Sequence, residues 1–400
     1  MSGIDASASP GVVLVLDAET RPALAVARSA GRRGHRVVAA THLPGAPALY
    51  SRYVSEQINL PSPNADFPGY ESALAELILS LDSPFVFVSS DHSLAALRRR
   101  REQFNQARIA LPDERSLAQA IDKVSTLAAA ERVGVPIPES IVVTRADEIG
   151  AAAASVGFPC VVKPSQSWLI EDGVRARRVT SVFLRNSHDD QRRAHAFVSL
   201  DHPALVQEFV PGRQEELAIF RCGSELVGIF AHIASRSFPP LGGASVMRTA
   251  VVPATDVIDF SDVLLSELTF EGYAELEYRR DANGQARLME INPRLPGSFE
   301  FSLRAGVDFV GLQLDWLAGL PTAGDNSYIP GMKMSWPRGE LAYLLAAVRR
   351  RPAPAPGMRA VARAVFDYVP PPTIDSLDMR DLRPTFVTLA RLLTAPMRRF

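Results

Sequence analysis

The stretch Gly272–Arg294, GYAELEYRRDANGQARLMEINPR, decides the fold, because two alternating runs of polar and apolar residues flank Asn283 and Gly284. An Asn-Gly dipeptide between such runs is the strongest short signal for a β-hairpin turn. Side chains alternate between the two faces of a strand, so one face of this hairpin is apolar and suited to a core. That face carries Ala274, Leu276, Tyr278, Met289 and Ile291.

The other face of the hairpin brings acidic side chains together. A two-residue turn at Asn-Gly predicts that Glu277 lies opposite Glu290 and that Glu275 lies opposite Asn292. Facing carboxylates, about 5 Å apart at Cβ, repel each other unless a positive charge lies between them. Carboxylate and amide oxygens are hard ligands that favour Mg²⁺ or Mn²⁺, and Mg²⁺ completes its shell with water and phosphate oxygens. The pattern predicts a metal and triphosphate site; the alternative is a solvated sheet face decorated with charges.

The N-terminal part predicts a small doubly wound parallel sheet. Its strand, helix, strand unit consists of a β-branched run at 11–16, an alanine-rich helix at 21–34 and an apolar run at 36–40. A helix at 70–81 then leads into the strand PFVFVSSD, which ends at Asp91. Open sheets of this kind bind ligands at the carboxyl ends of their strands, so Asp91 faces a ligand crevice or, equally well, caps the next helix.

The amino-acid composition excludes several classes of protein. The chain has 400 residues, 47% hydrophobic and 22% charged, which indicates two or three folded units and excludes wholesale disorder. The formal charge of -1 argues against a protein built to neutralise nucleic-acid phosphates. Two cysteines are too few for a disulfide framework, and no apolar run is long enough to span a membrane. We therefore expect a cytoplasmic protein without a membrane span and without a nucleic-acid partner.

The middle of the chain carries short motifs in a fixed order. An apolar strand, FPCVVKP, ends in a lysine beside a proline, and strands rich in antiparallel signals follow from residue 204. Together with the hairpin, these pieces resemble the ATP-grasp superfamily, in particular its carboxylate-amine ligase branch, which is similar to carbamoyl phosphate synthase. The pieces are Asp122-Lys123, Lys163-Pro164, Gln207–Val210 before a Pro-Gly, Glu290–Arg294 and Gly306–Phe309.

The resemblance implies a fold and a division into units. We expect an α/β, Rossmann-like pre-ATP-grasp domain, followed by an α+β ATP-grasp fold of two subdomains and a C-terminal helical extension. The expected ranges are 1–116 for the first domain, 117–204 for the central lid subdomain, 205–325 for the catalytic subdomain and 326–400 for the extension.

The resemblance also implies how ATP binds. Lys123 and Lys163 would hold the α- and β-phosphates. The segment Gln207 to Val210 would be the hinge, where backbone groups of Glu208 and Val210 bind adenine and Phe209 packs nearby.

Ribose and metal contacts follow from the same resemblance. One of Gln214, Glu215 or Glu216 would accept from the ribose hydroxyls, and Glu215 is the preferred choice. Glu277 and Glu290 would hold Mg²⁺ or Mn²⁺, with Asn292 on a second ion.

Three arginines are candidates for the reacting groups. Arg236, Arg248 and Arg294 would converge on the γ-phosphate or a substrate carboxylate, since planar guanidinium groups suit both anions. Where family members have a glycine-rich phosphate loop, residues 165–179 hold one glycine, Gly173. His232 lies near these arginines in the sequence and is more simply interpreted as a strand histidine of the core.

The resemblance implies a ligase that converts a carboxylate into an acyl phosphate with ATP and joins it to an amine. Its partners would be small-molecule carboxylates and amines, and a homodimer would be ordinary for such enzymes. Two alternatives stay open: a carboxylase or carbamoyl-phosphate-forming enzyme, and a nucleotide-binding regulator without turnover. The last 75 residues add a proline connector at 352–356 and an amphipathic helix, expected to dock on the body.

Overall fold

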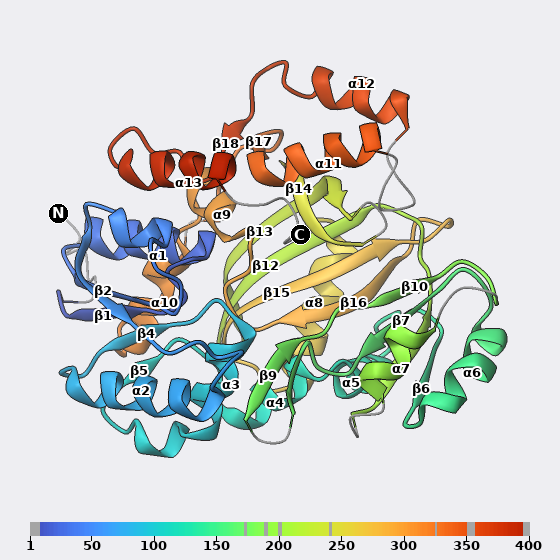
Figure 1. Ribbon diagram of the computed structural model, residues 1–400, viewed down its shortest axis with the longest axis horizontal. Coiled ribbons are helices and arrows are strands. Elements are labelled where there is room, and N and C mark those ends of the chain that lie inside the picture. The colour runs from blue at the N-terminus through green and yellow to red at the C-terminus, as the bar shows by residue number, and fades with distance from the viewer. Residues whose placement is uncertain are drawn as a thin grey trace.

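The computed structural model describes residues 9–171, 174–187, 191–198, 202–239, 242–324, 326–349 and 357–394. The proline connector at 352–356, Gly173 of the loop and residues 240–241 lie outside these ranges, as do the side chains of the last residues of the terminal helix. Figure 1 shows a parallel sheet at the N-terminal side, a long antiparallel sheet in the centre and helices of the C-terminal segment above both.

The first unit is a five-stranded parallel sheet of order β3-β2-β1-β4-β5 with helices on its faces. The predicted helices agree with α1 and α2 within a few residues. Its elements are β1 (Val12–Val15), α1 (Arg21–Arg32), β2 (Arg36–Thr41), η1 (Pro47–Tyr50), β3 (Val54–Asn59), α2 (Phe67–Ser80), β4 (Phe85–Phe87), α3 (Asp91–Arg99), η2 (Arg101–Gln103) and β5 (Arg108–Ile109).

The second unit is a four-stranded sheet of order β10-β7-β11-β6, with a separate hairpin of β8 and β9. Its elements are α4 (Glu114–Ile121), α5 (Lys123–Arg132), β6 (Ser140–Val143), η3 (Ala146–Glu148), α6 (Ile149–Val156), β7 (Cys160–Pro164), β8 (Trp168–Glu171), β9 (Arg175–Arg178), β10 (Val182–Leu184), α7 (Arg192–Val198) and β11 (Ala204–Glu208). The segment expected to be the phosphate loop therefore forms this hairpin, and Ala176 and Trp168 pack against the core of the first unit.

The third unit is a seven-stranded sheet of order β16-β15-β12-β13-β14-β17-β18. Its elements are β12 (Gln214–Cys222), β13 (Glu225–Phe238), β14 (Ala244–Ala250), α8 (Thr255–Glu267), β15 (Gly272–Arg280), β16 (Ala286–Asn292), α9 (Phe299–Ala305), α10 (Phe309–Leu317), β17 (Lys333–Ser335), α11 (Pro337–Arg349), α12 (Met358–Phe366), β18 (Thr373–Ile374) and α13 (Arg383–Thr394).

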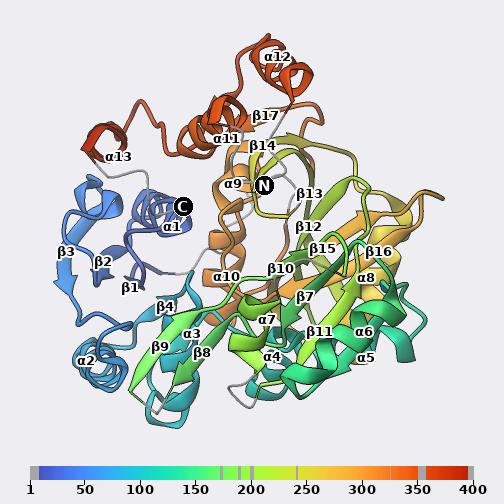
Figure 2. The same cartoon turned by 45° about the vertical axis from the view of Figure 1, so that its right-hand side comes forward.

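One core joins the first and third units. Val13 and Ala23 of the parallel sheet and its helix share a buried cluster with Phe220 and Phe230 of the large sheet and Phe299 of α9. Figure 2 shows α9 and α10 lying between the two sheets. The relative position of the two sheets is therefore fixed by buried apolar contact, which stabilises in proportion to the area removed from water.

The structure moves three of the expected boundaries. Residue 116 falls inside α4, and the boundary at 204 falls inside β11, which pairs with β6 and β7 of the central sheet. The segment from 326 onward is not a separate appendage, because β17 pairs with β14 and β18 pairs with β17. The extent of helix α4 moves the first limit, and strand pairing, which sequence composition does not report, moves the other two.

The carboxylates of β15 and β16 face each other as predicted, but the loop and the strand register that bring them together differ from the prediction. The loop closes between Asp281 and Gln285, with Gly284 at φ +82°, so it is one residue longer than the expected turn. A bulge then leaves Met289 unpaired, since Tyr278 pairs with Leu288 and not with Met289. The longer loop shifts the strand pairing by one residue and the bulge shifts it back, so Glu277 still pairs with Glu290.

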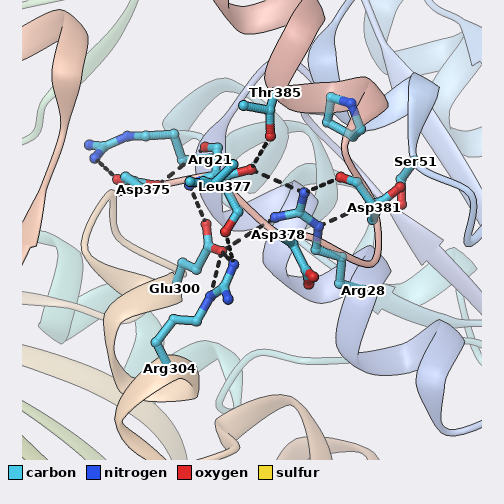
Figure 3. A network of polar contacts seen from close by, with 12 residues as sticks. Arg21, Arg28, Ser51, Glu300, Arg304, Asp375, Leu377, Asp378, Asp381 and Thr385 are labelled. Carbon is cyan, nitrogen blue, oxygen red and sulfur yellow. Dashed lines mark hydrogen bonds and ion pairs between the residues drawn. The ribbon is translucent and has the colours of Figure 1, made fainter. Parts of the chain in front are cut away.

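A buried network holds the C-terminal segment against the rest of the molecule (Figure 3). Arg28 of α1 donates from Nε to Asp381 at 3.0 Å and from Nη1 to Glu300 of α9 at 3.3 Å. The amide of Ser376 donates to Glu300 at 2.9 Å, and Arg21 donates to Asp375 at 2.5 Å. Segment 375–381 thus ties α1 to α9.

Candidate functional site

Glu277 and Glu290 face each other across β15 and β16, as the sequence predicts. Asn292 pairs with Glu275, and its side-chain amide donates to Glu277 Oε1 at 2.9 Å. That bond uses the nitrogen of Asn292 and leaves its carbonyl oxygen for another partner. Three oxygen donors of the kind that Mg²⁺ prefers therefore lie together at this end of the hairpin.

Further carboxylates crowd the same sheet face. Glu216 of β12 pairs with Glu277, and Glu275 accepts from Ser298 Oγ at 2.6 Å. Burial, and after it the charge of Glu290, raises the pKa of Glu277, while burial and the charge of Glu216 raise the pKa of Glu275 to about 8. Raised pKa values mean that these carboxyls keep their protons near neutral pH when no cation is bound, so a bound cation would favour their ionised form.

Two lysines surround Glu290. Lys123, the first residue of α5, is buried, and its Nζ lies 3.1 Å from Glu290 Oε2 and 3.2 Å from Ser167 Oγ. Burial lowers the pKa of Lys163 on β7 to about 8, although Glu290 acts in the opposite direction. Burial alone would raise the pKa of Glu290, but Lys123 and Lys163 hold it below its ordinary value. The charges are placed to receive an anionic ligand.

A cavity of about 410 Å³ opens beside these groups. Arg294 lines it, and its Nε donates to Asp91 at 2.6 Å. Asp91 does not cap α3, because Ser90 is the capping residue, so the ligand-crevice interpretation fits better. The lining comes from the first two units and β16, and includes Arg98, Arg99, Lys123, Ser167, Trp168, Glu290 and Asn292.

The expected hinge leaves β11 beside the site. Gln207 is buried and donates to Ser140 at 3.0 Å, and Phe209 packs edge-on against Phe183 with ring centres 5.1 Å apart. The amide of Glu208 already donates to the carbonyl of Glu139 at 2.9 Å. The carbonyl of Glu208 is therefore the one backbone group of this residue that is left for the expected contact with adenine. The backbone groups of Val210 make up the rest of the expected adenine contacts.

Arg279 connects this segment to the carboxylates. It lies two residues beyond Glu277 on β15, on the same face, and its Nη1 donates to the carbonyl of Val210 at 3.1 Å. Its guanidinium lies 5.5 Å from the ring centre of Phe209. A row of side chains therefore runs from the expected hinge to Glu277.

The preference for Glu215 as the ribose acceptor is corrected. Glu215 pairs with Tyr278, so it lies on the face of β12 opposite to Glu216 and Glu277. Both of its oxygens are held at 2.9 Å by Arg280. Gln214, the neighbour on the site face, donates to Glu216 at 3.0 Å and is the better placed of the three candidates.

The convergence of three arginines is also corrected. Arg236 is buried in ion pairs with Glu340 of α11 and Asp367, so it anchors the C-terminal segment. Arg248 is bonded to Ser245 at 2.8 Å and lies 3.5 Å from Asp375. Neither lines the cavity, which leaves Arg294 alone of the three.

Sequence reasoning missed the neighbours that strand pairing supplies. His232 of β13 is buried with its Nε2 2.7 Å from Glu216, and one ligand atom each of His232, Glu216 and Glu275 lies within 4.8 Å of the others. Alternation places Glu216 on one face of its strand, but nothing in the sequence says that β12 pairs with β15. Arg279 was missed for the same reason, whereas Arg98 and Arg99 were missed because nothing in the sequence says that α3 lines the cavity.

Comparison with known proteins agrees with this architecture. The family model "ATP-grasp in the biosynthetic pathway with Ter operon" matches residues 205–339. The chain is similar to a solved ADP complex of N5-carboxyaminoimidazole ribonucleotide synthetase, with a TM-score of 0.63 and 16% identity, covering 86% of this chain and 87% of that one. Residues 205–339 thus match an ATP-grasp family model, and most of the chain has a fold similar to that of the solved synthetase.

Other ATP-grasp relatives are similar over parts of the chain. The large chain of carbamoyl phosphate synthase from Pyrococcus furiosus is 27% identical over 190 residues, covering 46% of this chain and 17% of that protein. D-alanine--D-alanine ligase from Ectopseudomonas mendocina is 27% identical over 228 residues, covering 50% and 66%. The chain thus spans less than two thirds of the length of these curated relatives.

A solved biotin carboxylase complex from Campylobacter jejuni has a similar fold. Its TM-score is 0.62 at 16% identity, and the match covers 80% of this chain and 74% of that one.

Among the helices within the described ranges, none combines the length and the hydropathy needed to cross a bilayer.

Proposed function

We propose that this protein is an ATP-dependent ligase that activates a carboxylate as an acyl phosphate and joins it to an amine. The observation that carries the proposal is the facing pair Glu277 and Glu290, with Asn292 beside them and Lys123 against Glu290. A sheet face that is only solvated does not explain why two half-buried carboxylates lie in direct opposition.

The residues present fit ATP with a divalent cation. Glu277, Glu290 and Asn292 would hold Mg²⁺ or Mn²⁺, which supplies neutralising charge for the triphosphate. At the other end of the site, Oε1 of buried Gln207 has no hydrogen-bond partner within the described part of the chain. Such an orphaned acceptor beside the hinge suits a donor from a bound base.

Side chains of the protein would position the substrates and stabilise the charge of the phosphate groups. Lys123 and Lys163 would neutralise the phosphates, and Arg294 would stabilise the transferring phosphoryl group. A carboxylate oxygen of the substrate takes the γ-phosphoryl group and ADP leaves. The amine then attacks the acyl carbon, phosphate leaves, and the amine loses a proton. Arg98, Arg99 and Arg294 line the cavity and offer guanidinium donors for an anionic substrate, and each is held in place by an ion pair with a carboxylate.

The test is a screen for ADP and phosphate release with Mg²⁺, pairing a panel of amino and hydroxy acids with amines, and mass spectrometry of the products. We expect Glu290→Gln to remove nearly all ATP turnover while its circular dichroism and melting temperature stay close to those of the wild type. Glu267→Gln, an exposed carboxylate on α8, is the matched control. Turnover by folded Glu290→Gln at the wild-type rate would remove the proposed role.

A carboxylase or carbamoyl-phosphate-forming reaction is the second candidate, favoured by the relatives named carbamoyl phosphate synthase. ADP release that needs bicarbonate and no amino acid would select it. A regulator without turnover would bind ATP and release no phosphate with any pair. We further propose small-molecule substrates and a cytoplasmic setting, where ATP is available and the two free cysteines stay reduced. A homodimer remains a prediction.

A further inference from the structure

A second cluster of ligand-type side chains lies in the first unit. Glu19 follows β1, His42 follows β2, and His92 belongs to the first turn of α3. One ligand atom from each lies within 4.8 Å of the others, and His42 Nδ1 is 3.4 Å from Glu19 Oε1. Each side chain is 11 or 12% exposed, so the group is shielded but reachable.

Neighbouring polar groups hold these side chains in place. Asp17 Oδ1 lies 3.1 Å from Nε2 of His92, and Asp17 accepts from the amides of Ser89 and Ser90 at 3.0 and 2.8 Å. Glu19 accepts from Thr41 Oγ1 at 2.6 Å. A carboxylate on one ring nitrogen of a histidine fixes the tautomer and leaves the lone pair on the other nitrogen, which is how metal-binding histidines are held.

The place in the fold favours a ligand site over a structural cluster. The three residues lie at the carboxyl ends of β1, β2 and β4, where open parallel sheets bind ligands. Asp17 is held at φ 61°, an unfavourable backbone conformation for a residue other than glycine, and such strain concentrates at functional sites.

The cluster adjoins the cavity but shares no ligand with the proposed Mg²⁺ site. The ring centre of His92 is 5.5 Å from that of Trp168, and Trp168 lines the cavity together with Lys123 and Glu290. Nothing in the proposed ligase reaction uses Glu19, His42 or His92.

We propose that Glu19, His42 and His92 form a Zn²⁺ site of the two-histidine, one-carboxylate kind. Imidazole nitrogens make the set softer than the all-oxygen set of Glu277 and Glu290, which selects Zn²⁺ over Mg²⁺. Three protein ligands leave a fourth position for water or a substrate oxygen. The site does not depend on the proposed ligase function.

The experiment uses the full chain without a histidine tag, treated with a chelator and then titrated with Zn²⁺ by calorimetry and metal analysis. We expect one Zn²⁺ per chain and a visible ligand-field spectrum with Co²⁺. Glu19→Gln keeps the oxygen that accepts from Thr41, and His42→Ala removes a shielded ring. Each should weaken Zn²⁺ binding by more than the roughly 10–100-fold cost of losing an outer-shell partner.

Two control variants separate this site from others. Glu290→Gln, which alters the proposed Mg²⁺ site, and His195→Gln, in α7, should both keep the wild-type affinity for Zn²⁺. The proposal is overturned if the chelator-treated wild type binds no Zn²⁺. It is equally overturned if folded Glu19→Gln and His42→Ala bind Zn²⁺ as the wild type does, or if Glu290→Gln abolishes binding.

Discussion

At the scale of single residues, the position of a side chain on one face or the other of a strand decides its role. Gln214 and Glu216 share the face of Glu277, whereas Glu215 points to the other side and is neutralised by Arg280. Neighbours in sequence therefore have unrelated surroundings, and chemical likeness to a ligand is not enough to choose among them.

This alternation gives a prediction for ATP binding. We expect Gln214→Ala to raise the KM for ATP about 2- to 12-fold, which corresponds to one hydrogen bond of about 0.5–1.5 kcal/mol, with little change in kcat. Glu215→Gln should leave the KM for ATP unchanged and lower the melting temperature, because Arg280 loses a charged partner. Steady-state kinetics with both variants checks this; a raised KM in Glu215→Gln alone would restore the original assignment.

At the scale of elements, the hairpin of β15 and β16 sets the register of the proposed metal ligands Glu277 and Glu290. Its loop needs Gly284 at positive φ, and its bulge at Met289 corrects the pairing so that Glu277 meets Glu290. β16 lies at the edge of the large sheet, where β15 is its strand partner and the Leu288 amide donates on the outer side to the carbonyl of Pro136 at 2.9 Å.

The loop can be tested by one substitution. Gly284→Ala meets no atom within 4 Å, so its cost comes from the backbone alone, about 1–2 kcal/mol of unfolding free energy. Ala282→Ser, exposed in the same loop, should change the stability by less than about 0.5 kcal/mol. Urea unfolding measures both variants, and equal stabilities would show that the loop adapts without strain.

At the scale of the whole molecule, segment 375–381 acts as a buried clamp between the first and third units. Arg28 is 1% exposed and bonds to Glu300 and Asp381, which come from different parts of the chain. A fully buried ion is tolerated only where its partners satisfy it, so loss of one member leaves uncompensated charge.

Arg28→Ala should lower the free energy of unfolding by about 3–5 kcal/mol, because Glu300 and Asp381 lose a buried cation. Arg36→Ala breaks the exposed pair with Glu56 and should cost no more than about 1 kcal/mol. Chemical denaturation compares the two variants. Similar small losses would mean that water enters the clamp and replaces the guanidinium.

The carboxylates of the clamp should make the stability of the protein depend on pH. Burial opposes the charge of Asp375, but Arg21 and Arg248 hold its pKa below the usual 3.8. Burial and the charge of Asp375 raise the pKa of Glu300, so Glu300 takes up a proton first. A depressed carboxyl pKa adds stability above the unfolded value, and this contribution is lost as the pH falls through the folded value.

The difference in unfolding free energy between wild type and Asp375→Asn should therefore be constant from pH 7 to about pH 5 and shrink below about pH 4. Glu300→Gln is the companion variant, because the pKa of Glu300 is raised where that of Asp375 is lowered. The difference in unfolding free energy between wild type and Glu300→Gln should therefore change above pH 4. Urea unfolding across this range supplies the values. A constant difference for Asp375→Asn down to pH 3 would contradict the depressed pKa.

The sequence by itself determined the parallel N-terminal sheet, because its strand and helix periodicities are local, and its ordered motifs carry a resemblance to the ATP-grasp superfamily. It also predicted that Glu277 faces Glu290, although the loop and the bulge that produce this facing differ from the expected turn. Only the tertiary structure decided that Glu216 joins the carboxylates, that Arg236 and Arg248 are anchors, and that residues beyond 326 complete the large sheet. Those facts depend on pairing between strands distant in sequence. Alternation tells which side chains share a face of one strand, but not which strand will lie beside it.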